Sequence, residues 1–339
     1  MRSDRLLSIS HKYSYVIVIA MTREINLISN NASLPALISN AGTGASRRFI
    51  EFFTAQIRNP NTRSAYYRAT TRFMNWCENS GIHLEEIQPV MVAAYVEALS
   101  ESHSAPSVKQ HLAALRRLFD WLVIGQVIPT NPASSVRGPK HLVREGKTPI
   151  LDEQEMRTLL DSLNTGKLSD LRDRAILSLM AYSFARVGAL TKMQVKDYYR
   201  QGSKAWFILH EKGGKLNKVP AHHNATEYVE LYLSATGIEY ERNTPLFRSL
   251  SHRGNVLTEK AIQRPNVFHM VQRRITKAGL PREIGCHSFR GTGITNFLQN
   301  GGDIETAAKI AGHASTRTTQ LYDRRIDIVN QGEIERIRF

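Results

Sequence analysis

The chain has 339 residues, of which 42% are hydrophobic and 22% are charged, and its formal net charge is +15. This length allows two domains with separate cores, and the composition excludes a disordered or fibrous chain. Such a positive surplus indicates a polyanionic partner, most often nucleic acid, although a merely basic protein is the alternative. Two cysteines, Cys77 and Cys286, are too few for a disulfide framework or a zinc knuckle, and they fit a reducing compartment.

Residues 1–45 are expected to be a flexible N-terminal extension. The apolar run over residues 15–21 is far shorter than the roughly 20 residues that span a bilayer, and no signal-peptide cleavage site is evident. We therefore expect no membrane partner. We also expect Met21 to be the natural start, so that residues 1–20 are an upstream extension.

Residues 46–138 are predicted to form a helical domain. Helices are expected over residues 46–57, after an N-cap in Asn61-Thr62, after Pro89 and after Pro106, with apolar residues at helical spacing and no strand pattern between them. Asn131-Pro132 ends this region, and the basic, turn-rich stretch 139–149 reads as an interdomain linker.

Residues 150–324 are predicted to form a second domain with a small β-hairpin. Two helices are expected first, over residues 152–163 and then from a cap at Asp170. A strand at residues 206–210, a turn at 211–215 and a return strand at 217–221 follow. Helices are expected to dominate from about Ala225 onward. The fold class is thus mainly α with a small hairpin or sheet.

Six side chains of this second domain suit chemistry on a phosphodiester. Arginines and a lysine can hold the non-bridging oxygens, histidines can move protons, and a tyrosine hydroxyl can act as the nucleophile once its high pKa is overcome. Such a site needs no metal and no cofactor. The six are Arg186, Lys212, His287, Arg290, His313 and Tyr322.

Each of these residues also has an ordinary structural reading. Tyr322 is one of twelve tyrosines, Arg186 could serve a structural ion pair, and Lys212 lies in a turn where lysines are usually solvated. The glycines at 291 and 293, near the start of the helix expected to begin at His287-x-x-Arg290, are predicted to allow close approach by a ligand.

Taken in this order, the six residues resemble the active site of the tyrosine site-specific recombinase (phage integrase) family, over about residues 46–325. The resemblance implies a helical, SAM-like core-binding domain at residues 46–138 and an α+β catalytic domain at residues 150–324. One departure is visible. The family often carries a carboxylate three residues after the first arginine, and this chain has Ala189 there.

The resemblance also implies the chemistry. Tyr322 would attack the scissile phosphate, form a 3′-phosphotyrosyl link and release a 5′-hydroxyl, which Lys212 would protonate. Two arginines would clamp the non-bridging oxygens, and two histidines would hydrogen-bond the phosphate, with His287 also accepting the tyrosine proton. The bond energy is kept, so neither ATP nor a metal is required.

The implied partner is double-stranded DNA with specific recombination sites. The protein would be a monomer in solution and a homo-tetramer on DNA, acting through a Holliday junction in the cytoplasm, on the nucleoid. Accessory DNA-bending proteins are candidate partners. The tail at 325–339 is expected to dock on a neighbouring protomer, or alternatively on the body of the same chain. Candidate DNA contacts are Arg63, Arg68, Lys109, Gln110, Arg116, Arg117 and Lys140.

The expected function is integration or resolution for a mobile element. A type IB topoisomerase-like relaxing enzyme would share the phosphotyrosine chemistry and is the first alternative. The second is an architectural DNA-binding protein with a decayed active site, which only Ala189 favours.

Overall fold

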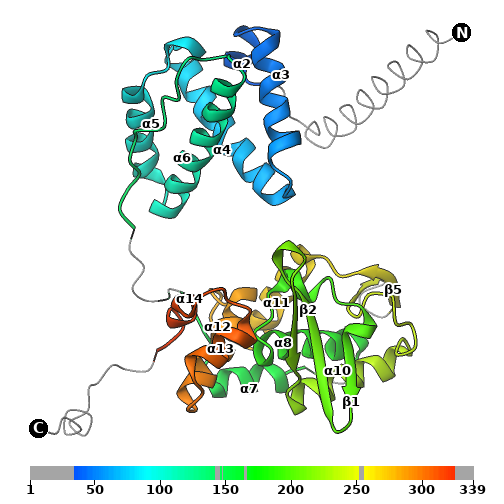
Figure 1. Ribbon diagram of the computed structural model, residues 1–339. Helices are drawn as coiled ribbons and strands as arrows, with labels where there is room; N and C mark the ends of the chain where they lie inside the picture. Colours follow the sequence, from blue (N-terminus) through cyan, green and yellow to red (C-terminus); the bar gives the residue numbers. More distant parts are fainter. Residues whose placement is uncertain (1–33, 142–145, 147, 164–165, 252–255, 325–339) are drawn as a thin grey trace, which may run out of the picture. The chain divides into compact units, whose positions relative to one another are not determined.

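The computed structural model describes residues 34–141, 146, 148–163, 166–251 and 256–324, with the side chain of Lys212 left out (Figure 1). The expectations for residues 1–33 and for the tail at 325–339 lie outside this part. The chain divides into two compact units, Met1–Leu142 and Val143–Phe339. This division falls inside the stretch 139–149, and the exact domain bounds stay a prediction.

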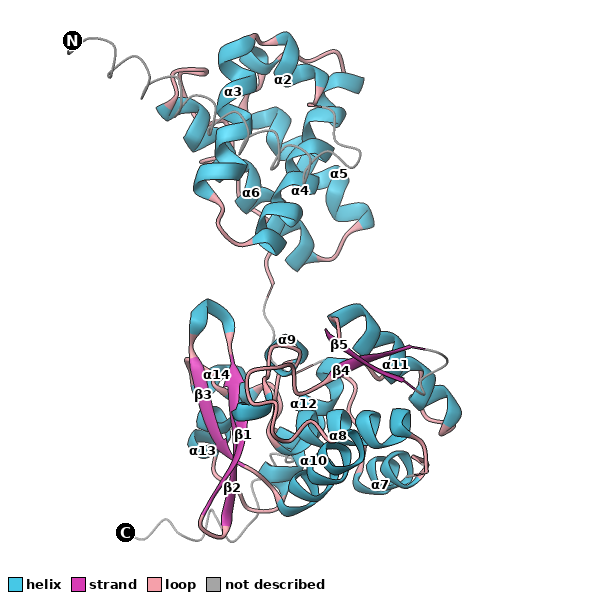
Figure 2. Cartoon of the chain, turned by 90° about the vertical axis from the view of Figure 1, so that its right-hand side faces the viewer, coloured by secondary structure: helices cyan, strands magenta, loops and turns pink. Residues whose placement is uncertain are grey.

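The first unit is a bundle of helices around one apolar core (Figures 1 and 2). Fully buried rings of Phe73 and Phe119 lie at its centre, 5.9 Å apart between centroids and edge to face. Its elements are α2 (Ala36–Asn40), α3 (Thr43–Glu51), the π-helical turn η1 (Phe52–Gln56), α4 (Pro60–Asn79), η2 (Leu84–Glu86), α5 (Pro89–Ser102) and α6 (Ala105–Ile124).

Prolines mark the start of three of these helices, as the sequence pattern suggests. Pro60 is the first residue of α4, and the side chain of Asn59 caps the helix by accepting from the backbone of residues 61 and 62. The predicted cap at Asn61-Thr62 is therefore wrong, because proline needs no donor partner in the first turn. Leu37 and Ile38, which precede the predicted bound at residue 46, are also buried in its core.

The described part of the second unit contains eight α-helices, two 3-10 turns and two small antiparallel sheets, and the two sheets lie on opposite sides of the helices in Figure 2. Its α-helices are α7 (Glu153–Asp161), α8 (Leu168–Tyr182), α9 (Val187–Leu190), α10 (His223–Thr236), α11 (Arg264–Lys277), α12 (Cys286–Gln299), α13 (Ile304–Ala311) and α14 (Thr316–Gln320), and a 3-10 turn η3 (Val195–Asp197) precedes the first strand.

The predicted hairpin is present as β2 (Lys204–His210) and β3 (Leu216–Pro220), joined by the turn η4 (Lys212–Gly214). The sequence pattern misses a third strand, β1 (Tyr198–Gln201), which pairs with β2. It also misses the pair β4 (Arg248–Ser251) and β5 (Val256–Ala261), which lies within the region after Ala225 where helices dominate as expected. These strands are only four to six residues long and too short to produce a clear alternation.

Helix α8 is the buried centre of the second unit and packs against α10 and α12. The predicted cap at Asp170 is wrong, because Lys167 occupies the N-cap position. The carboxylate of Asp170 is instead buried and accepts from Arg274 at 2.6 Å, and Arg274 also pairs with the fully buried Asp173. This buried ion cluster fixes α11 against α8.

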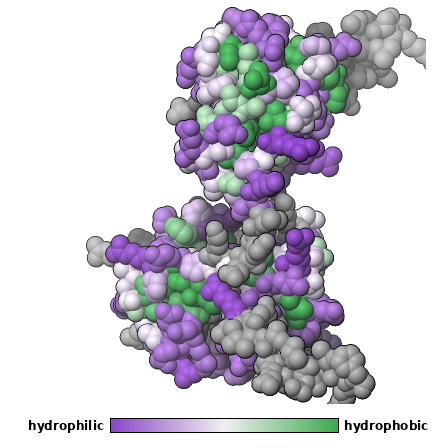
Figure 3. Space-filling model, turned by 90° about the vertical axis from the view of Figure 1, so that its left-hand side faces the viewer, coloured by the Kyte–Doolittle hydropathy of each residue, from purple (hydrophilic) through white to green (hydrophobic). Residues whose placement is uncertain are grey.

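Among the helices that the structure describes, none is both long and apolar enough to cross a membrane. On the face shown in Figure 3, hydrophilic residues cover most of the visible surface of both units, and smaller hydrophobic areas show between them.

Candidate active site

Arg290 lies at the centre of the site, in the first half of α12, with 1% of its surface exposed. Its guanidinium donates to the carbonyls of Phe184 and Ala311 and, at 2.6 Å, to Nε2 of His313. Burial and the nearby charge of Arg186 lower its pKa to about 10. Its Nε has no partner among the described residues, and a buried charge with a free donor favours an anionic ligand.

Two glycines let α12 pack this closely. A Cβ atom at Gly293 would lie 1.9 Å from the carbonyl oxygen of Ala181 on α8, and one at Gly291 would lie 3.5 Å from the ring of Tyr322. The close neighbours are therefore parts of the protein. The expectation that a ligand approaches these glycines closely stays a prediction.

His313 reaches Arg290 because α13 ends in a left-handed residue, Gly312, with φ +61°. Burial, followed by the charges of Arg290 and Arg186, lowers the pKa of His313 to about 4, so the ring is neutral at pH 7. Nε2 then accepts from Arg290, and Nδ1 donates to the hydroxyl of Thr319 at 2.8 Å. The ring also stacks on Tyr322, with 6.2 Å between centroids.

The hydroxyl of Tyr322 lies 2.6 Å from Nε2 of His287, the second residue of α12. Burial raises the pKa of Tyr322, whereas the charges of Arg290 and Arg186 act to lower it. Burial and the same two arginines lower the pKa of His287, which favours a neutral ring whose Nε2 can accept a hydrogen bond from the hydroxyl. Because Thr295 holds the backbone carbonyl of Tyr322 at 2.8 Å, the hydroxyl has a defined position.

Arg186 comes at the junction of α8 and α9, and 41% of its side chain is exposed. Its NH1 donates to Oε2 of Glu211 at 2.6 Å, and Glu211 is 6% exposed. The sequence pattern missed Glu211, because nothing in its neighbours along the chain indicates that its partner is Arg186. Lys212 itself lies in the turn η4, and its side chain is outside the described part.

The structure thus brings five of the six candidates into one cluster, since hydrogen bonds join Arg290 to His313 and Tyr322 to His287, and Arg186 acts electrostatically on all four. The sixth, Lys212, follows directly on the residue that binds Arg186.

The candidate DNA contacts on the first unit fall into two groups. Arg63 donates to the carbonyl of Ile57 at 3.1 Å, and Arg116 donates to the carbonyls of Ala133 and Val136, so both guanidiniums have structural partners. The other five side chains are exposed, and their contact with DNA stays a prediction: Arg68, Lys109, Gln110, Arg117 and Lys140.

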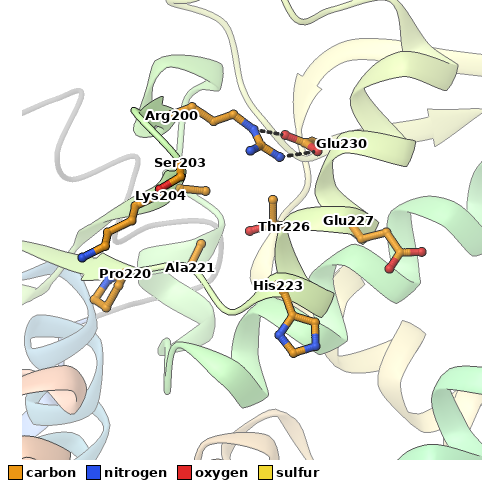
Figure 4. Close-up of a pocket in the computed structure, with 10 residues that line it drawn as sticks. Arg200, Ser203, Lys204, Pro220, Ala221, His223, Thr226, Glu227 and Glu230 are labelled. Atoms are coloured by element: carbon orange, nitrogen blue, oxygen red, sulfur yellow. Dashed lines mark hydrogen bonds and ion pairs between the residues drawn. The ribbon is translucent and has the colours of Figure 1, made fainter.

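A cavity of about 370 Å³ lies elsewhere on the second unit, between α10 and the sheet (Figure 4). Arg200 and Glu230 on its wall form a two-pronged ion pair at 2.7 and 3.0 Å. None of the six candidate residues lines this cavity, so it is separate from the site above.

Comparisons with known proteins agree with this geometry. Tyrosine recombinase XerC of Leptospira interrogans is 26% identical over 293 residues, covering 85% of this chain and 91% of the relative. Tyrosine recombinase XerC of Escherichia coli is 28% identical over 281 residues, covering 81% and 89%.

Solved structures show the same fold. XerH site-specific recombinase bound to difH substrate matches with a TM-score of 0.65 at 17% identity, over 90% of this chain and 97% of that chain. A lambda integrase dimer bound to a COC′ core site matches with a TM-score of 0.63 at 17% identity, over 85% and 98%.

Family models match both units. Residues 47–125 match the N-terminal SAM-like domain of phage integrases, and residues 149–327, more than half of the chain, match the phage integrase family. The protein therefore belongs to the phage integrase family of tyrosine recombinases, enzymes that break and rejoin DNA strands by transesterification.

Proposed function

We propose that this chain is a site-specific recombinase that exchanges strands between two DNA sites through a 3′-phosphotyrosyl intermediate and a Holliday junction. One observation carries the proposal. A tyrosine hydroxyl, a neutral histidine 2.6 Å from it and a buried guanidinium with a free Nε donor share one pocket. This combination provides a nucleophile, a base and an anion-binding group without a metal.

Arg290 and Arg186 bind the non-bridging oxygens of the scissile phosphate. Three hydrogen bonds to protein acceptors hold the guanidinium of Arg290, which leaves its Nε free for the phosphate. Arg186 is partly exposed and can follow the DNA backbone. An arginine clamp contributes on the order of 10³–10⁵ in rate in phosphoryl transfer.

The protons move in opposite directions on the two sides of the phosphorus. The oxygen of Tyr322 attacks phosphorus as His287 Nε2 takes its proton, and the bond from phosphorus to the 5′ oxygen breaks. Lys212 gives a proton to that oxygen, and His313 hydrogen-bonds the phosphate. A 5′-hydroxyl of the partner strand then reverses the steps and releases Tyr322.

The assembly is a homo-tetramer on DNA that forms from monomers in the cytoplasm. The solved structure of a lambda integrase tetramer bound to a Holliday junction, which shares the fold with a TM-score of 0.62, supports this arrangement. We further propose that residues 325–339 dock on a neighbouring protomer and that the natural task is integration or resolution for a mobile element.

A covalent-adduct assay tests the proposal. DNA duplexes are selected by binding from a random-sequence library, a nick is placed at successive positions, and products are separated on a denaturing gel. We expect an adduct that disappears in Tyr322→Phe. Relaxation of plasmids of any sequence without recombinant products would favour a topoisomerase-like enzyme, and binding without any adduct would favour an architectural protein.

A further inference from the structure

We propose that Glu211 is the positioning residue that holds Arg186 against the scissile phosphate, in place of the carboxylate that this chain lacks at position 189. The inference deepens the proposed function and rests on it. Glu211 does not touch DNA in this scheme. It acts through the guanidinium that does.

The contact between the two side chains is close and directional. NH1 of Arg186 lies 2.6 Å from Oε2 of Glu211, the length of a strong charge-assisted hydrogen bond. The carboxylate is 6% exposed, whereas 41% of the arginine side chain faces solvent. Glu211, the buried partner, is thus fixed in position and orients Arg186. The remaining N–H donors of Arg186 stay available to a phosphate.

Position 189 cannot do this work in the present sequence. Ala189 follows Arg186 by three residues, in the short helix α9, and its methyl group is 2% exposed in the apolar core. An apolar side chain gives Arg186 neither charge nor hydrogen bond. A long, partly exposed arginine without a partner would sample many rotamers and would lose entropy on binding the phosphate.

Glu211 also balances the charge of the whole pocket. Burial and Arg186 lower the pKa of Arg290, and the charge of Glu211 opposes that effect. Its second oxygen, Oε1, is buried without a hydrogen-bond partner among the described residues and lies 3.8 Å from where a Cβ of Gly312 would be. The carboxylate therefore lies between Arg186 and the turn that presents His313.

The location of Glu211 has a further effect that a carboxylate at 189 would not have. Glu211 follows the last residue of β2 and directly precedes Lys212, and Asn217 on β3 donates to the carbonyl of Ile310 near the end of α13. Both contacts anchor the base of the hairpin to the site. One ion pair thus fixes Arg186 and also the turn that carries Lys212.

The test measures single-turnover adduct formation by the full chain on the nicked, library-selected duplex, together with DNA affinity. We expect Glu211→Gln to bind DNA as the wild type does and to form adduct about 100-fold more slowly, the typical cost of a misplaced group. Adding Ala189→Glu to Glu211→Gln should recover about tenfold or more of this loss. Glu227→Gln, which removes an exposed carboxylate of α10, is the matched control and should change neither value.

Three results would overturn the inference. The first is a wild-type rate of adduct formation in Glu211→Gln. The second is a folded double variant, Glu211→Gln with Ala189→Glu, that forms adduct no faster than Glu211→Gln alone. If the double variant does not fold, the third is a Glu211→Asp variant that forms adduct no faster than Glu211→Gln. Failure of the proposed function looks different, because the wild type itself would then give no adduct that depends on Tyr322.

Discussion

Helix α12, which carries His287 and Arg290, contains two glycines whose replacement by alanine should have opposite consequences. In Gly293→Ala the new Cβ would lie 1.9 Å from the carbonyl oxygen of Ala181 and 2.8 Å from the ring of Phe184. Carbon and oxygen normally stay ~3.3 Å apart, so α12 and α8 must separate by more than ~1 Å. In Gly291→Ala the nearest atom is a methyl carbon of Ile150 at 3.0 Å, which can give way.

The magnitudes follow from two opposing terms. Alanine gains about 1 kcal/mol over glycine inside a helix. Overpacking a core costs about 1–3 kcal/mol, and a clash with backbone belongs at the upper end of that range. We expect Gly293→Ala to lower the free energy of unfolding by about 2 kcal/mol, or the Tm by ~4–8 °C for a unit of this size. Gly291→Ala should leave both unchanged or slightly raised.

Urea unfolding followed by circular dichroism measures the difference between the two variants. If Gly293→Ala proves as stable as Gly291→Ala, the close packing of α12 on α8 is refuted.

Three further predictions follow from the burial and the partners of single side chains. Burial and neighbouring arginines lower the pKa of His287, so its neutral form persists below the usual value of about 6.5. When the enzyme concentration is below Kd, the pH dependence of the rate of adduct formation reports the pKa of the free enzyme. We expect this rate to fall at acidic pH with a midpoint below pH ~6.5. A midpoint at or above pH ~6.5 would contradict the role of His287 as the base that accepts the tyrosine proton. The lowered pKa of His287 also stabilises the folded state. This stabilisation is present when the pH is above the pKa of His287 in the unfolded chain, and it is lost as the pH falls through the lower pKa of His287 in the folded protein. Asp173→Asn should lower the free energy of unfolding, measured in urea, by about 3–5 kcal/mol, because it breaks a buried ion cluster. Glu153→Gln, which breaks an exposed ion pair with Arg157, should lower it by about 1 kcal/mol or less. Equal losses in the two variants would contradict the importance of the buried cluster. Arg116→Ala should lower stability because it frees two carbonyls, whereas Arg117→Ala should keep stability and reduce the slope of log affinity against log salt by about 1. A flat salt response of DNA binding would remove the charge-based reasoning.

Features encoded by neighbouring residues could be predicted from the sequence. Pro89 starts a helix where one was expected, because the effect of proline on the backbone is local. The hairpin that carries Lys212 was visible as two apolar runs around a glycine turn. The candidate site was found because a resemblance supplied the order of its residues, and spacing alone left each of them with an ordinary reading.

Features that depend on distant partners could not be predicted. Asp170 looked like a helix cap because its sequence neighbours say nothing about Arg274, which lies 104 positions away. Glu211 was placed in the hairpin turn at residues 211–215 without a role, since its partner Arg186 belongs to a different element. In both cases the decisive interaction is an ion pair that forms only when the fold removes a carboxylate from water.

The segment that leads into the catalytic unit has a consequence for protein engineering. Arg324 donates to the carbonyl of Thr148, the backbone of Leu151 donates to Thr292, and a side chain at Gly146 would collide with the carbonyl of Leu321. Gly146 and Thr148 therefore lie against residues on either side of Tyr322, and Leu151 lies against α12. A chimaera that grafts another DNA-recognition domain onto this enzyme should be joined before Gly146 and should keep that glycine.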